Sequence, residues 1–106
     1  MSRYLIRARY TAEGARGIAS GGGSARRAAV EKMVTGVGGT LESFYFAFGD
    51  EDVYTIVELP DHTAAAAVAL AVNASGAVNL RTVVLLSPEE IDAAAQQTVG
   101  YTPPGG

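Results

Sequence analysis

The chain has 106 residues, 48% of them hydrophobic, with a net charge of −3 at pH 7 and a pI near 5.0. This length fits one domain, and the apolar content excludes a disordered chain. The charge gives no field that would attract nucleic acid or an anionic membrane, the lack of cysteine excludes disulfides and thiolate chemistry, and a single histidine, His62, argues against a metal site. The N-terminus begins directly with a strand pattern, and the longest apolar run, Ala64–Val72, is too short to span a bilayer, so we expect a cytoplasmic protein.

Residues 3–10 alternate in the way that predicts a β-strand. The even-numbered side chains point to one face, and the odd-numbered ones, three of which are arginines, point to the other. Residues 11–19 predict a short helical turn broken by Gly14 and Gly17, and residues 20–23 predict a flexible glycine-rich loop.

A helix and a β-hairpin follow. Ser24 is the expected cap of a helix that runs to about Val37, where Gly38-Gly39 ends it. Its apolar residues recur at intervals of three and four and form one face, namely Val30, Met33, Val34 and Val37. Residues 40–48 and 53–59 predict two strands joined by a turn. Strict alternation in the first of them places Glu42, Phe44, Phe46 and Phe48 on one face and Leu41, Ser43, Tyr45 and Ala47 on the other.

Two further helices and one strand complete the chain. Asp61 is the expected cap of a helix that runs to Ala74. Residues 78–86 predict a fourth strand. Ser87–Glu90 has the form of an N-cap, a first-turn proline and two acids, which predicts a last helix ending near Gln97.

The predicted order is β-α-β-β-α-β with one terminal helix, which is typical of the α+β ferredoxin-like split βαβ fold. Such a fold has a four-stranded antiparallel sheet with both main helices on one face. Its first and third strands are central, and its second and fourth strands are edges. We expect one domain over residues 1–98 and a mobile tail over residues 99–106.

All four strands carry apolar residues on both faces, and two-sided apolar strands favour burial on both sides. The simplest solution is a homodimer over the open sheet face, with a higher oligomer of edge-to-edge packing as the alternative. The helix segment 64–72 is apolar almost all round, so either the terminal helix or a neighbouring subunit is expected to cover it.

Several short motifs together resemble one known family. They are Tyr10-Thr11-(x)2-Gly14, Gly38-Gly39, Phe44-Tyr45, Gly49-(x)2-Asp52, Pro60-Asp61 and Asn79-Leu80-Arg81-Thr82. In their order and spacing, over about Arg3 to Ile91, they resemble the GYD-domain family of small bacterial proteins. That resemblance implies a ferredoxin-like fold similar to the dimeric α/β-barrel proteins, and it implies no common reaction. The family's tyrosine at the hairpin turn is replaced here by Glu51.

Three mid-strand arginines, Arg7, Arg9 and Arg81, are the first candidates for a site. An arginine inside a strand is costly to bury unless it is paired, and a guanidinium suits a carboxylate, phosphate or enolate ligand. The alternative, which we favour, is a structural ion pair with Glu42, Glu58 or a partner subunit. Because Arg81 is predicted on an edge strand, it need not contact Arg7.

Two acids and the histidine are candidates for proton transfer or binding. Glu58 and Asp52 are expected on one face of the third strand with Tyr54, where a desolvated carboxylate acts as a general base. The simpler interpretations are a salt bridge from Glu58 to Arg7 or Arg9 and a turn hydrogen bond for Asp52. His62, in the first turn of its helix, is either a neutral catalytic imidazole or, as we favour, an ordinary surface residue.

Aromatic residues and one glycine-rich loop complete the candidates. The aromatic side chains either sandwich a planar ligand or form the core and the dimer interface; they are Tyr4, Tyr10, Tyr45, Tyr54, Phe44, Phe46 and Phe48. Ser20–Ser24 with Arg26 and Arg27 resembles an anion site at a helix start, although it fits no nucleotide motif and a surface loop is the simpler interpretation.

These residues lead to one functional hypothesis and one alternative. The hypothesis is a protein that binds or converts a small anionic, aromatic or enolisable molecule between sheet and helices without a cofactor. Arg7, Arg9 or Arg81 would hold the anion, with Tyr54 and Asp52 as further ligand contacts, and the catalytic candidates are Glu58, Tyr45 and His62. The alternative is a ligand-binding, regulatory or assembly module without chemistry.

Overall fold

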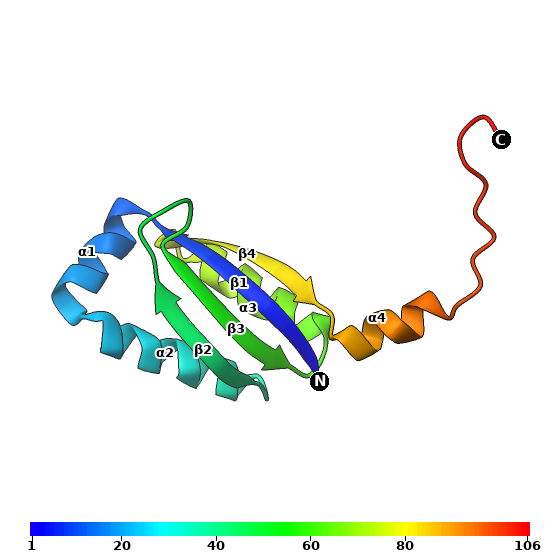
Figure 1. Cartoon of the computed structure of the whole chain (residues 1–106). Helices are drawn as coiled ribbons and strands as arrows, with labels where there is room; N and C mark the ends of the chain where they lie inside the picture. Colours follow the sequence, from blue (N-terminus) through cyan, green and yellow to red (C-terminus); the bar gives the residue numbers. More distant parts are fainter.

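A four-stranded antiparallel sheet with two helices on one face forms the body of the structure, a computed structural model that describes all 106 residues (Figure 1). The elements are β1 Ser2–Tyr10, α1 Ala12–Gly21, α2 Gly23–Gly36, β2 Thr40–Phe46, β3 Val53–Leu59, α3 His62–Ala74, β4 Val78–Leu85 and α4 Pro88–Ala95. The strand order is β2-β3-β1-β4, so β1 and β3 are central. The predicted α+β ferredoxin-like fold is confirmed.

The core lies between the sheet and the pair α2 and α3. It forms because β1 and β3 alternate, with their inward side chains almost completely buried. The main cluster consists of Tyr4, Ile6, Val30, Val34, Leu41, Val57, Leu59 and Ala65. Met33 and Val37 pack against this cluster, so the predicted apolar face of α2 is confirmed. The outward face of the sheet carries arginines, glutamates, tyrosines and a few aliphatic residues and is covered by no element of this chain (Figure 1).

A β-bulge at Glu42 changes the alternation of β2. Leu41 lies opposite Val57, and the next paired residue, Ser43, lies opposite Ile56. The bulge therefore puts Leu41 on the inward face together with Phe44, whereas strict alternation predicts the two on opposite faces. That prediction is wrong because one extra residue in a strand shifts the side-chain period.

The segment between β1 and α2 is more helical than its glycines suggest. α1 is a continuous helix of 10 residues, capped by the Thr11 hydroxyl, which accepts a hydrogen bond from Gly14 N at 3.3 Å. The expected flexible loop over residues 20–23 is reduced to Gly22, whose φ of 85° separates α1 from α2. Gly22, rather than Ser24, is the N-cap of α2.

Local capping signals correctly place the later helices. Asp61 accepts a hydrogen bond from Ala64 N at 2.8 Å at the start of α3, and Ser87 and Glu90 form a complete capping box at the start of α4. α4 buries no residue, and Figure 1 shows it and the following chain extending away from the body. The radius of gyration is therefore 17.0 Å, whereas a compact chain of this length has about 13 Å. α4 does not cover α3 within the chain.

The helices are all short. None is long and apolar enough to cross a membrane.

Candidate functional site

The open face of the sheet holds the predicted arginines Arg7, Arg9 and Arg81. Because β4 pairs with β1, Arg81 lies directly opposite Arg7, a contact that the edge position alone does not require. Arg7 donates to Glu51, with 3.2 Å between Nη2 and Oε1, and the Glu51 side chain is only 3% exposed. Arg81 is exposed and forms no ion pair. The expected carboxylate partner of Arg81 is therefore absent from its own chain.

At the other end of this face, Arg3 joins two glutamates. Its Nη2 lies 2.7 Å from Glu42 Oε1 and 3.0 Å from Glu58 Oε1. The hydrogen bond and negative charge of Glu42, with a smaller contribution from Glu58, raise the pKa of Arg3 above its ordinary value. The Glu58 ion pair is thus with Arg3 and not with Arg7 or Arg9, because Arg3 is the residue opposite Glu58 in the register. Arg9 donates from Nε to the Asp50 carbonyl at 2.5 Å.

The remaining candidate residues lie in different parts of the molecule. Tyr45 and Tyr54 are paired neighbours on the open face, with Tyr45 70% exposed. Asp52 Oδ2 accepts from Tyr10 N at 2.9 Å, so this carboxylate joins the hairpin to β1 and does not cap a local turn amide. His62 is exposed, as expected, and its Nδ1 lies 2.6 Å from the hydroxyl of the buried Tyr4. The structure therefore does not bring His62 together with the arginines, which occupy the opposite face of the sheet.

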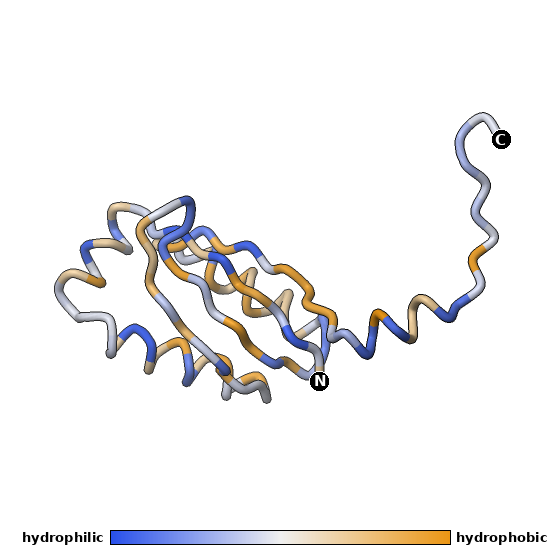
Figure 2. The backbone as a smooth tube through the Cα atoms, viewed as in Figure 1, coloured by the Kyte–Doolittle hydropathy of each residue, from blue (hydrophilic) through white to orange (hydrophobic).

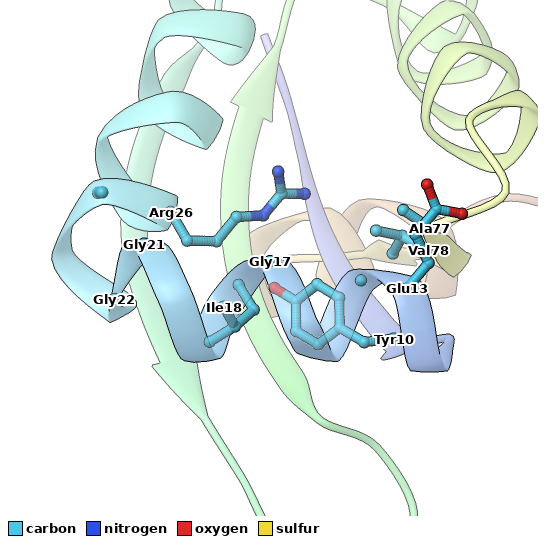
Figure 3. Close-up of a pocket in the computed structure, with 11 residues that line it drawn as sticks. Tyr10, Glu13, Gly17, Ile18, Gly21, Gly22, Arg26, Ala77 and Val78 are labelled. Carbon is cyan, nitrogen blue, oxygen red and sulfur yellow. The ribbon is translucent and has the colours of Figure 1, made fainter.

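A cavity of about 390 Å³ lies between α1, the start of α2 and the start of β4 (Figure 3). Arg26 extends from α2 into this space, with its guanidinium carbon 5.8 Å from the centre of the Tyr10 ring. The Arg26 Nε is buried without a hydrogen-bond partner, and Arg26 forms no ion pair. Buried polar groups are normally hydrogen-bonded, so the Arg26 Nε is an unsatisfied donor beside this cavity.

A smaller, apolar cavity lies next to this one in the core. The inner cavity has about 30 Å³ and is lined by 13 residues, 11 of them hydrophobic. Tyr10, Arg26 and Val78 line both spaces. Glu13 lines the outer cavity without an ion pair of its own, and in Figure 3 its carboxylate lies on the side of Ala77 and Val78. The arrangement offers a cation, an acceptor, an aromatic face and an apolar recess.

Sequence reasoning identifies Arg26 and Tyr10 only in part. Arg26 stands out as a cation at a helix start, and Tyr10 as one of many aromatics, but nothing local places one above the other. Glu13 carries no signal in the sequence. Gly22 brings Arg26 close to Tyr10, because its positive φ turns α2 back beside α1 and β1.

Comparison with known proteins gives one match. The family model of the GYD domain matches residues 4–95 of the 106. No curated protein and no solved structure matches the chain. Since the family model spans most of the chain, this protein belongs to the GYD-domain family.

Proposed function

We propose that this protein binds a small organic anion with an apolar or aromatic part in the cavity between α1, α2 and β4. The observation that carries the proposal is the unpartnered, buried Nε of Arg26 at the wall of a cavity of about 390 Å³. A guanidinium beside an aromatic ring suits a planar carboxylate or enolate, because it donates in a fixed fork while the ring excludes water on one side.

The rest of the ligand follows from the other walls. The recess of about 30 Å³ beyond Tyr10 and Val78 takes no more than a methyl group, so a ring or short aliphatic chain would lie in the outer cavity against Ile18 and Ala77. Glu13, an acceptor without a partner, suits a hydroxyl or amino group on the same molecule. The ligand class is therefore an organic acid with an apolar body and one further donor. Binding without chemical conversion is the simplest function, since Glu58, Tyr45 and His62 do not line this cavity.

Calorimetric titration of the full chain with benzoate and para-hydroxybenzoate tests the proposal, with the neutral benzyl alcohol for comparison. Arg26→Gln should weaken acid binding by roughly 10- to 100-fold. This loss corresponds to the value of about 1.5–3 kcal/mol for a hydrogen bond to a charged group. Arg27→Gln is the matched control, because Arg27 is the next residue and its partner is Glu31 in an exposed pair at 3.7 Å. Equal binding by wild type and Arg26→Gln, or no binding of either acid, would contradict the proposal.

A further inference from the structure

α1 lies beside the body of the molecule but buries none of its own residues (Figure 1). Its start is fixed to the segment before β4, because the Thr11 hydroxyl donates to the Gly76 carbonyl at 3.0 Å and Thr11 N donates to the Ala77 carbonyl at 3.0 Å. Figure 2 shows that the strands are strongly hydrophobic, whereas α1 is mostly pale. A surface helix normally buries an apolar stripe, so α1 leaves unfilled the space that such a stripe would occupy.

The face of α1 that is turned toward the body carries glycines. A Cβ on Gly14 would lie 2.1 Å from the Ala77 carbonyl oxygen and 3.2 Å from the Tyr10 ring, which identifies this face. Gly17 and Gly21 follow at helical spacing on the same face, and both line the cavity of about 390 Å³. A Cβ on either of them would meet nothing within 4 Å. The cavity is therefore the space that ordinary side chains on this face would fill.

Nothing within the chain requires a glycine at position 17. Gly17 lies in the middle of α1, and it is not one of the glycines with a positive φ. Its missing Cβ is not needed for packing, in contrast to that of Gly14. Glycine inside a helix is less stable than alanine, so Gly17 keeps this space open at the expense of helix stability.

The opposite wall of the same cavity provides an independent sign of a ligand. The Arg26 Nε is buried without a hydrogen-bond partner, and the Arg26 guanidinium lies over the Tyr10 ring. A carboxylate that binds Arg26 leaves the rest of its molecule between Arg26 and α1, because the inner recess of about 30 Å³ is too small for it. The apolar body would then lie against Gly17, Ile18 and Gly21 (Figure 3).

We propose that Gly17 is a specificity-determining residue, which admits an organic acid with an apolar body as large as two fused rings. This body packs against α1 and takes the place of the side chains that the helix lacks. The inference rests on the proposed function and adds the size of the ligand. A volume of about 390 Å³ supports it, since sites of roughly 300–1,000 Å³ hold drug-sized molecules, which are larger than a single ring.

Calorimetric titration of the full-length chain with benzoate and 2-naphthoate tests this proposal. The wild type should bind 2-naphthoate roughly 10-fold more tightly than benzoate, because the second ring adds apolar contact with α1. Gly17→Leu fills the space beside the helix, so it should weaken 2-naphthoate binding by roughly 10-fold or more and remove the preference for the larger acid.

Gly36→Leu is the matched control. Gly36 is also helical, its Cβ would meet nothing within 4 Å, and it does not line the cavity. This variant should bind both acids as the wild type does. Gly17→Ala adds a single methyl group and keeps the test independent of folding. It should melt no lower than the wild type without ligand, and it should still weaken 2-naphthoate binding.

Two results would overturn this inference alone. One is Arg26-dependent acid binding by the wild type without any preference for 2-naphthoate. The other is a Gly17→Leu or a folded Gly17→Ala protein that binds 2-naphthoate as tightly as the wild type. Failure of the proposed function gives a different pattern, in which the wild type binds neither acid or Arg26→Gln binds both equally well, and that pattern overturns the two proposals together.

Discussion

At the scale of single residues, the buried acid Glu51 distinguishes this chain from the tyrosine-bearing turn of the family it resembles. Glu51 is 2% exposed, and its only hydrogen-bond partner is Arg7, which remains one-third exposed. An acid at such a position is tolerated because it is paired, and the pair joins the hairpin to β1.

Glu51→Gln should lower the free energy of unfolding by about 1–3 kcal/mol, because it removes the charged partner of a buried pair. Glu42→Gln is the control, since Glu42 pairs with the exposed Arg3 and surface ion pairs contribute little to stability. Urea denaturation of the two variants measures the difference. Equal destabilisation by the two variants would show that the Glu51–Arg7 pair contributes no more to stability than the Glu42–Arg3 pair.

Arg81→Leu should leave the stability of an isolated chain within about 0.5 kcal/mol of the wild type, because Arg81 is exposed and unpaired. Relief of its repulsion with Arg7, the residue opposite, favours a small gain. The check is a thermal melt at low protein concentration. A melting temperature lowered by many degrees would contradict the absence of a partner for Arg81 in its own chain.

At the scale of elements, α1 depends on where its glycines face. A Cβ on Gly14 would lie 2.1 Å from the Ala77 carbonyl oxygen, whereas a Cβ on Gly17 would meet nothing within 4 Å. Gly14 thus permits the close approach of α1 to the segment before β4, which also closes one side of the Arg26 cavity. Gly17 has no such role.

The two glycines should therefore respond in opposite directions to the same change. Gly14→Ala should destabilise by about 1–3 kcal/mol, because backbone must move to relieve the overlap. Gly17→Ala should stabilise by about 0.5–1 kcal/mol, since alanine loses less backbone entropy in a helix. Chemical denaturation measures the free energy of unfolding of both variants. A stabilised Gly14→Ala protein would contradict the close packing of α1 against Ala77.

At the scale of the whole molecule, the uncovered sheet face is the surface over which the sequence predicts a homodimer. Val83 and Val84 are successive residues of edge strand β4 and point to opposite faces, because Val83 pairs with Leu5 and Val84 with the buried Tyr4. They are 38% and 52% exposed in the single chain. Substitution at either position therefore tests one face at a time.

We predict that the wild-type chain is a dimer at micromolar concentration and that Val83→Asp is a monomer, because packing over the open face would bury an unpaired charge between two sheets. Val84→Asp should leave the dimer intact, since this residue lies on the helix side. Light scattering gives the mass of each variant. A wild-type chain that is already monomeric, or a Val83→Asp variant that remains dimeric, would contradict assembly over this face.

The sequence by itself determined the features that depend on neighbours along the chain. The alternation of β1 assigns its two faces correctly because side-chain direction has a period of two. The caps Asp61 and Ser87 are recognisable because a capping hydrogen bond spans only three residues. The resulting element order is sufficient for the ferredoxin-like fold.

Only the tertiary structure decided the features that need a distant partner. The bulge at Glu42 appears when β2 is paired with β3, and the meeting of Arg81 with Arg7 follows from the register of β1 with β4. The burial of Glu51 beside Arg7 joins residues 44 positions apart. The candidate cavity has the same origin, because Arg26 meets Tyr10 only after Gly22 has turned α2 back over β1. Long-range packing, which no local pattern encodes, sets which charges are paired and which remain free for a ligand.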